Sequence, residues 1–385
     1  MTLTTQLSLN RPEWFQPVPA GTGHYVVALQ NLQGERDALI HVAEETWAHL
    51  TPLIEILGPK KRETEPFTRE RVAAWVKKAS NAVTGRPCFL DVLRLPPNHP
   101  TATKTGNHSV LSVIHSEARV RGMPFVPVLR LSDAGTTVRQ IAEAAACDAR
   151  GVALRYPLFR TVSADGRRPQ ALIQEALNAV EVDVLGADLI MDLGYLSEDV
   201  EVVAEDLAAA IEELVSIGNW RSVVLLGSSM PSTLGGGIVE EGTLGRLPRR
   251  EWELWSELIA LRPSRLPTFG DYAVQNPEPP LEDQPTGPGQ RANIRYTTDD
   301  ATLVPRAVGA VIQEGAEQYR ELCRLLVAQP EFAGRDFTWG DKQIAECADG
   351  IGEPGWQNQW RGAGTSHHLR QVVEQLAQVQ VMANL

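Results

Sequence analysis

Charged residues interrupt several apolar runs of the chain near the C-terminal ends of those runs. Carboxylates stand at Glu55, Asp91, Asp192 and Asp271, and a guanidinium stands at Arg155. A charge inside an apolar run is costly unless it is paired, hydrogen-bonded or bound to a metal. Converging carboxylates can share a divalent cation, neutralise an arginine, or shift each other's pKa for acid–base work. We therefore predict that these five side chains point into one cavity.

Two interpretations of this set stay open at the level of sequence. In the first, the cluster faces a ligand, and Mg²⁺ or Mn²⁺ is a possible cofactor. In the second, Glu55, Asp91 and Asp192 brace Arg155 and Arg130 in a closed network. The direction of Arg130 is not fixed by the pattern.

A loop of small residues follows another apolar run. Residues 227–237 read GSSMPSTLGGG. Gly227, Ser228 and Ser229 would let the backbone approach an anion, as loops after the last strands of (β/α)8 barrels do. A flexible glycine loop explains the same residues, and the spacing matches neither a P-loop nor a dinucleotide-binding fingerprint.

A further set of polar residues lies toward the C-terminus. Asp341 precedes a helical segment and is either a ligand-binding group or an N-cap. His367 and His368 open the last predicted helix, where they could bind phosphate or act as acid–base groups. Adjacent histidines point in different directions on a helix, so we expect at most one of them to be functional.

These residues form the predicted site. The predicted catalytic residues are Glu55, Asp91, Asp192, Asp271, His367 and His368. The predicted substrate-binding residues are Arg155, Ser228, Ser229, Tyr272, Arg295, Tyr296, Asp341 and Arg361.

The sequence lacks the motifs of a zinc site and of a serine hydrolase. The four cysteines form no close pair, and HExxH is absent, so a zinc site is not supported. The cysteine spacing is typical of reduced thiols inside a cell. No GxSxG motif indicates a serine hydrolase.

The elements that position the site alternate regularly. Eight short apolar runs are separated by amphipathic helical stretches, and the runs cover residues 24–30, 51–57, 87–93, 124–131, 151–158, 187–195, 222–230 and 266–274. Consecutive apolar positions are typical of strands buried on both faces of a parallel sheet. Eight strand–helix units in about 250 residues fit a (β/α)8 barrel. The alternative is an open doubly wound sheet, and pairing of the run at 24–30 with that at 266–272 decides between them.

After the eighth run the alternation stops. We predict a TIM-like α/β barrel over residues 1–274 and a C-terminal elaboration over 275–385, which supplies the eighth helix and covers the barrel mouth. A long loop at 275–292 is rich in proline and glycine. Residues 293–297 and 301–308 predict a β-hairpin, and a last helix is predicted from His367.

Net charge and the lengths of the apolar runs limit which partners we expect. A net charge of -12 repels nucleic acid overall. Phosphate binding then needs a local basic patch, and we expect Arg130, Arg155, Arg295, Arg361 and His367 to converge. No apolar run approaches the roughly 18–20 residues that cross a bilayer, and no secretory signal is evident, so we expect a cytoplasmic protein.

The ordered motifs resemble the phage "beta protein" family. They are Tyr25, Gly34–Glu35, Pro52–Ile56, Gly270–Tyr272, Arg295–Thr297, Gly340–Ile344, Trp360–Arg361 and His367–His368, and they span nearly the whole chain. Family members carry a Lys where this chain has Gln30, so one positive contact is lost if that Lys holds a phosphate. The resemblance implies a phage, mobile-element or antiviral defence context and no defined activity.

Three functions remain open on these grounds. The first is a metal-dependent phosphodiesterase or nucleotide hydrolase that acts at the barrel mouth on a small anionic ligand or a nucleic-acid end. The second is a non-catalytic sensor or a partner subunit of a defence complex that uses the same mouth. The third is glycosidase-like chemistry, for which two carboxylates would suffice.

Overall fold

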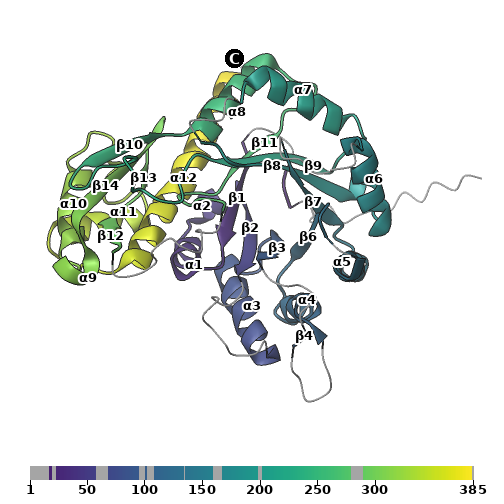
Figure 1. The fold of residues 1–385 in the computed structure, drawn as a ribbon, viewed down its shortest axis with the longest axis horizontal. Helices are drawn as coiled ribbons and strands as arrows, with labels where there is room; N and C mark the ends of the chain where they lie inside the picture. Colours follow the sequence, from purple (N-terminus) through teal and green to yellow (C-terminus); the bar gives the residue numbers. More distant parts are fainter. Residues whose placement is uncertain are drawn as a thin grey trace, which may run out of the picture.

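Eight parallel strands close into a barrel in this computed structural model, which describes residues 17–19, 23–57, 68–94, 100–101, 108–133, 135–158, 167–197, 202–278 and 289–383 (Figure 1). The strands, in their order around the barrel, are β1 (Tyr25–Gln30), β11 (Thr268–Asp271), β9 (Ser222–Ser228), β8 (Ala187–Tyr195), β7 (Val152–Pro157), β6 (Phe125–Arg130), β3 (Cys88–Arg94) and β2 (Leu50–Leu57). β1 pairs with β11 in parallel, with Val26 opposite Gly270. The predicted closure, and with it the TIM-like α/β fold, is confirmed.

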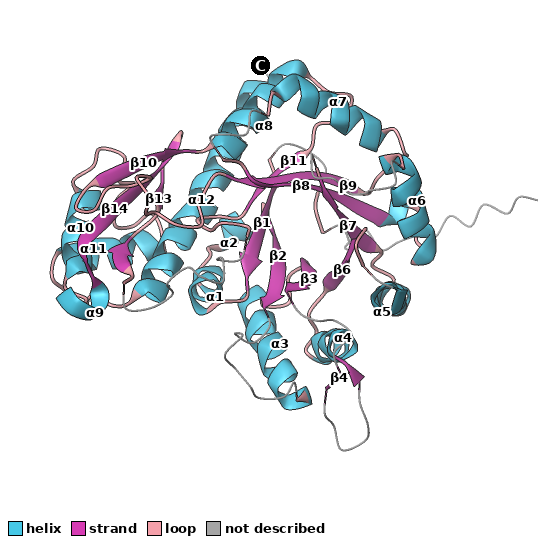
Figure 2. Cartoon of the chain, viewed as in Figure 1, coloured by secondary structure: helices cyan, strands magenta, loops and turns pink. Residues whose placement is uncertain are grey.

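Helices surround the strands on the outside of the barrel (Figure 2). They are α1 (Gln33–Ile40), α2 (Glu44–Trp47), α3 (Arg69–Val83), α4 (Val110–Val120), α5 (Gly135–Asp148), α6 (Pro169–Ala179), α7 (Ala204–Val215), α8 (Arg250–Leu261) and α12 (Gln357–Ala383). A 3₁₀ turn, η1 (Val184–Gly186), precedes β8, and the short strands β4 (Pro100–Thr101) and β5 (His108–Ser109) pair next to α4.

The strands are covered on both faces. Side chains such as Val26, Leu53 and Phe89 pack inside the barrel, while their neighbours Tyr25, Ile54 and Leu90 pack in the large core that the helices share. Because both faces are buried, the strands need apolar residues at consecutive positions.

A smaller antiparallel sheet lies beside the barrel, on the left in Figure 1. Its strands are β10 (Leu244–Pro248), β12 (Arg291–Asn293), β13 (Tyr296–Thr297) and β14 (Ala301–Ala310). The helices of this part are α9 (Val311–Glu314), α10 (Gln318–Val327) and α11 (Trp339–Ala348). β13 and β14 form the predicted hairpin, with Tyr296 opposite Leu303. β10 comes from the connection between β9 and α8 and pairs with β14, which the sequence did not predict.

Helix α12 joins the two parts. Its middle turns place Leu369, Val372 and Leu376 in the barrel's outer core, whereas Trp360 and Ala363 in its first turns belong to the core of the small sheet. The helix packs on α1 and β1 and lies between α8 and α1 in Figure 1, the place of an eighth barrel helix.

The predicted start of this last helix at His367 is wrong, because α12 begins at Gln357. Its early turns contain Gly362 and Gly364, which disfavour a helix by about 1 kcal/mol each relative to alanine. Both are needed for close packing. A Cβ on Gly364 would lie 2.3 Å from the carbonyl oxygen of Arg295, and one on Gly362 would lie 2.9 Å from that of Gly34. Tertiary contact therefore overrides local propensity.

Among the described residues, no helix has the length and apolar character that spanning a membrane requires.

Candidate functional site

Arg155 is the centre of a buried polar network inside the barrel, where it projects from β7. Its Nη1 donates to Glu55 at 2.9 Å and to Asp91 at 2.6 Å, and its Nε donates to Asp192 at 2.9 Å. Its Nη2 donates to the Tyr272 hydroxyl at 2.6 Å. Because these strands are parallel, their inward residues near the C-terminal ends meet at the same end of the barrel. The structure thus brings four of the five predicted strand-end residues together, with Tyr272 added.

Two further contacts complete this network. The Tyr272 hydroxyl donates to Asp192 at 2.7 Å. Arg130 donates to the second oxygen of Asp91 at 2.6 Å, so its side chain points inward. Burial raises the pKa of Tyr272 well above its usual range; Arg155 opposes this, whereas Asp192 and Glu55 add to it. The phenol is therefore a neutral donor, and the arrangement matches the closed, bracing network.

Access to the network is restricted. The side chains of Asp192 and Arg130 are 15% and 16% exposed, whereas those of Glu55, Asp91 and Arg155 are at most 5% exposed. Burial favours the neutral form of Arg155, but Tyr272 and the carboxylates hold its pKa well above the usual value. Within this network, only Asp192 and Arg130 are exposed enough for a ligand at the barrel mouth to contact them.

These carboxylates do not fit a resident metal ion. The described part of the chain contains no group of three or more His, Cys, Asp or Glu side chains arranged to hold one. Arg155 occupies the space between Glu55, Asp91 and Asp192 and donates to all three. A possible Mg²⁺ or Mn²⁺ cofactor therefore finds no support in this geometry.

Asp271 does not join the cavity, which corrects the prediction. Its side chain points out of the barrel toward α12, where it accepts a hydrogen bond from the Tyr25 hydroxyl and meets His368 Nε2 at 2.9 Å. His368 Nδ1 lies 2.7 Å from the Thr297 hydroxyl. Strand alternation places Tyr272, and not its neighbour, on the inner face.

The Asp271 cluster is completely buried. Burial opposes ionisation of Asp271, but His368 and Tyr25 hold the pKa of this carboxyl below its usual value. Burial lowers the pKa of His368 despite the opposing effect of Asp271. A neutral imidazole that donates from Nε2 to Asp271 and accepts from Thr297 satisfies every contact, so the cluster links β1, β11, β13 and α12.

His367, Asp341 and Tyr296 meet in the small-sheet part instead. His367 Nδ1 lies 3.1 Å from Asp341 and its Nε2 lies 2.8 Å from the Thr297 carbonyl oxygen. Tyr296 donates to Asp341 at 2.8 Å and stacks on the His367 ring. The backbone N–H of Asp341 donates to the Thr338 hydroxyl, which is the N-cap of α11. The N-cap is therefore Thr338, and Asp341 stands three residues inside the capping turn.

The predicted anion loop is closed by internal contacts. The Ser229 N–H and hydroxyl both donate to Glu251, at 2.9 Å and 2.6 Å. The Ser228 hydroxyl donates to the Gln275 carbonyl at 3.0 Å. The prediction that these two serines face an anion is not supported, because their donors already have acceptors.

Arg295 and Arg361 share a small polar cleft between the barrel and the small sheet. The cleft has a volume of about 60 Å³ and is lined by Gln275, Gln290, Asn293, Arg295, Gln357, Trp360 and Arg361. Arg295 donates to the Val274 carbonyl, but its buried Nε has no hydrogen-bond partner in the described chain. Burial and the charge of Arg361 lower the pKa of Arg295 to about 10, against the opposing effect of Glu35.

Glu35, in the first turn of α1, interacts electrostatically with both of these guanidiniums. It is 1% exposed, and neither carboxylate oxygen accepts a hydrogen bond from another described residue. Burial raises the pKa of Glu35, while Arg361, Arg36 and Arg295 act against this. The positive charges of Arg361, Arg36 and Arg295 outnumber this one buried carboxylate, so the arrangement can accommodate added negative charge.

The expected convergence of five cations is wrong. Arg130 and Arg155 are neutralised inside the barrel, and His367 belongs to the Asp341 cluster. Only Arg295 and Arg361 share a cleft.

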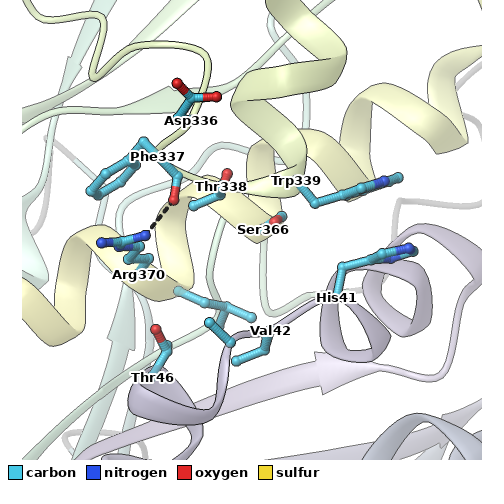
Figure 3. Close-up of a pocket in the computed structure, with 11 residues that line it drawn as sticks. His41, Val42, Thr46, Asp336, Phe337, Thr338, Trp339, Ser366 and Arg370 are labelled. Atoms are coloured by element: carbon cyan, nitrogen blue, oxygen red, sulfur yellow. Dashed lines mark hydrogen bonds between the residues drawn. The ribbon is translucent and has the colours of Figure 1, made fainter.

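A larger pocket lies on another flank of α12 (Figure 3). Its volume is about 240 Å³, and it separates the α1–α2 turn from the segment before α11. His41 stacks on Trp339 at 4.5 Å between ring centroids at one side, and Arg370 donates to the Phe337 carbonyl at the other. None of the predicted site residues lines this pocket.

Sequence reasoning missed most of the cleft. The cleft amides stand in loops, at a strand end or at a helix start, and no spacing rule distinguishes them; they are Gln275, Gln290, Asn293 and Gln357. Glu35 did have a signal, because it forms part of the Gly34–Glu35 motif in the family resemblance.

Comparisons with known proteins identify a family for this chain. A family model described as Beta protein matches residues 25–374. Comparison with curated proteins gives no match. Among solved structures, the chain is similar to a GH138 enzyme targeting pectin rhamnogalacturonan II, with 9% identity and a TM-score of 0.35 over 83% of this chain. It spans 42% of that protein, and this likeness carries no argument about activity.

Proposed function

This chain belongs to the Beta protein family, and we propose that it binds a small anionic, phosphate-containing ligand in the cleft of Arg295 and Arg361. The supporting observation is that Arg295 and Arg361 line one polar cleft, and that the buried Nε of Arg295 has no hydrogen-bond partner within the described chain. Guanidinium groups are well suited to phosphate oxygens, which they bind in pairs of hydrogen bonds.

Helix α12 contributes to the same cleft. Gln357 is the first residue of this helix, and Arg361 stands one turn later. The N-terminus of a helix carries partial positive charge and free N–H groups, both of which favour an anion. The cleft is therefore locally positive although the molecule has a net charge of -12.

A binding role is favoured over phosphodiester or nucleotide hydrolysis. The carboxylates that hydrolysis would use at the barrel mouth already accept hydrogen bonds from Arg155 and Arg130. We therefore propose a non-catalytic sensor or partner subunit, in a defence context. Tight Mg²⁺ or Mn²⁺ binding that disappears in Asp192→Asn would favour hydrolysis instead.

A thermal-shift screen tests the binding role. Wild type, Arg295→Ala and Arg361→Ala are heated with inorganic phosphate, nucleotides, cyclic nucleotides and short single-stranded oligonucleotides. A charge-assisted contact contributes about 1.5–3 kcal/mol, so each substitution should weaken binding by roughly tenfold to a hundredfold. Arg335→Gln is the matched control, because it removes an exposed arginine that pairs with Asp349 outside the cleft. No response to any phosphate compound would refute the proposal.

A further inference from the structure

We propose that the cleft selects the terminal, dianionic phosphate of a phosphomonoester, with Glu35 as the internal counter-anion that the phosphate replaces. This inference rests on the proposed function and specifies its ligand. It follows from the size of the cleft, from its charge, and from the packing that holds Glu35 beside Arg361.

The size of the cleft limits what can enter. Its volume of about 60 Å³ is far below the roughly 300–1,000 Å³ of pockets that enclose a drug-sized ligand. The cleft can therefore take one phosphate group but cannot enclose a whole nucleotide. The rest of the ligand must extend out of the cleft. A monoester has one substituent, whereas a diester must lead two substituents out of the same small space.

The charges favour a dianion. Arg295 and Arg361 bring two positive charges, and Glu35 brings at most one negative charge. A phosphomonoester carries a charge of about -1.5 to -2 at pH 7, because its second pKa is about 6. Once Glu35 is protonated, the dianion balances both guanidinium charges, whereas a diester, with one negative charge, leaves one of them without a counter-charge. Hydrogen bonds from a guanidinium are strongest when the acceptor is a charged oxygen, so both arginines bind best when each meets a phosphate oxyanion.

Glu35 is held in place by close backbone packing. Its neighbour Gly34 touches α12 so closely that a Cβ there would lie 2.5 Å from the Asn358 carbonyl oxygen. The charged groups that act most strongly on Glu35 are cations: Arg361 on α12, Arg36 on its own helix, and Arg295 before β13. When a dianion pairs with Arg295 and Arg361, the buried carboxylate loses the effect of two of these three cations and binds a proton. Ligand binding is therefore linked to proton uptake.

Isothermal titration calorimetry on the full chain tests this ligand class. Phenyl phosphate is compared with its diester, methyl phenyl phosphate, at pH 8, where the monoester is already dianionic. Each titration is repeated in two buffers with different protonation enthalpies, which reports the number of protons taken up. We expect at least tenfold tighter binding of the monoester, together with proton uptake.

Two variants identify the responsible groups. Arg361→Gln should lose tenfold or more in affinity for phenyl phosphate. Glu35→Gln, which has nearly the same shape, should bind the monoester at least as tightly and without proton uptake, and its melting temperature verifies the fold. Arg335→Gln again serves as the control.

The failures are distinguishable. Equal affinity for the two esters, or proton uptake that persists in Glu35→Gln, overturns this inference and leaves the anion cleft intact. Binding of neither ester, nor of inorganic phosphate, overturns the proposed function as well.

Discussion

Arg155 holds three carboxylates and one phenol through a single buried guanidinium. Removing one member of such a network leaves uncompensated charge in the interior, which costs about 3–5 kcal/mol. We expect Arg155→Met to lower the free energy of unfolding by that amount in urea titrations. Arg167→Met, at an exposed pair with Glu175, should change it by about 0.5 kcal/mol or less. Unchanged stability of Arg155→Met would show that the carboxylates do not depend on this cation.

The same residues show how far a sequence predicts a site. Glu55, Asp91, Arg155 and Asp192 could be placed because a charge in an apolar strand must be compensated. The direction of Asp271 could not, since a strand buried on both faces shows no alternation that would separate it from Tyr272. Glu35 resembles any acidic residue in a first helical turn, which is favourable in itself. Its burial without a hydrogen-bond partner depends on packing against α12, which lies more than 300 residues later in the chain.

Helices α11 and α12 approach through small residues. A Cβ on Gly340 would lie 2.0 Å from the carbonyl oxygen of Ala363, an atom of a packed backbone that has no room to shift. Overpacking of this kind costs about 1–3 kcal/mol, and we expect Gly340→Ala to lower stability by that amount in thermal or urea unfolding. Gly135→Ala is the matched control, because a Cβ there meets no atom within 4 Å. Equal effects of the two substitutions would contradict the close approach.

Prediction at the scale of elements succeeded where the pattern was local and regular. Eight apolar runs gave the eight barrel strands, and their closure followed from the count. The first turns of α12 were not predicted because Gly362 and Gly364 indicate a loop when considered without their packing partners. β10 was missed for a related reason: its partner β14 comes about 55 residues later, and its own residues are only partly buried.

Acid should destabilise the whole molecule through buried neutral histidines. Burial, together with His49, lowers the pKa of His24 to about 4. Burial, together with Arg119, lowers that of His115 to about 3. The unfolded chain binds protons at these residues below about pH 6.5 and the folded chain does not, so stability is full above pH 6.5 and falls as the pH drops.

The slope of this loss can be measured. Each such histidine contributes about 1.4 kcal/mol per pH unit between pH 6 and 4. We expect His115→Gln to reduce the slope of the unfolding free energy against pH by about that amount. A variant slope equal to that of the wild type would mean that His115 is protonated without unfolding.

The position of α12 in the ring also affects how the protein is made. β1 and β11 can pair once Asp271 has left the ribosome. The contacts of Tyr25 with α12, through His368 and the core that contains Leu369, can form only after those residues have also been synthesised. At about 5–20 residues per second, translation of the intervening tail takes roughly 5–20 seconds. During this interval the apolar outer face of the nascent barrel where β1 pairs with β11 is not covered by α12. This exposed face forms an apolar wall. We expect chaperones to recognise this wall during synthesis, and a ribosome-bound chain that stops before α12 to be prone to aggregation.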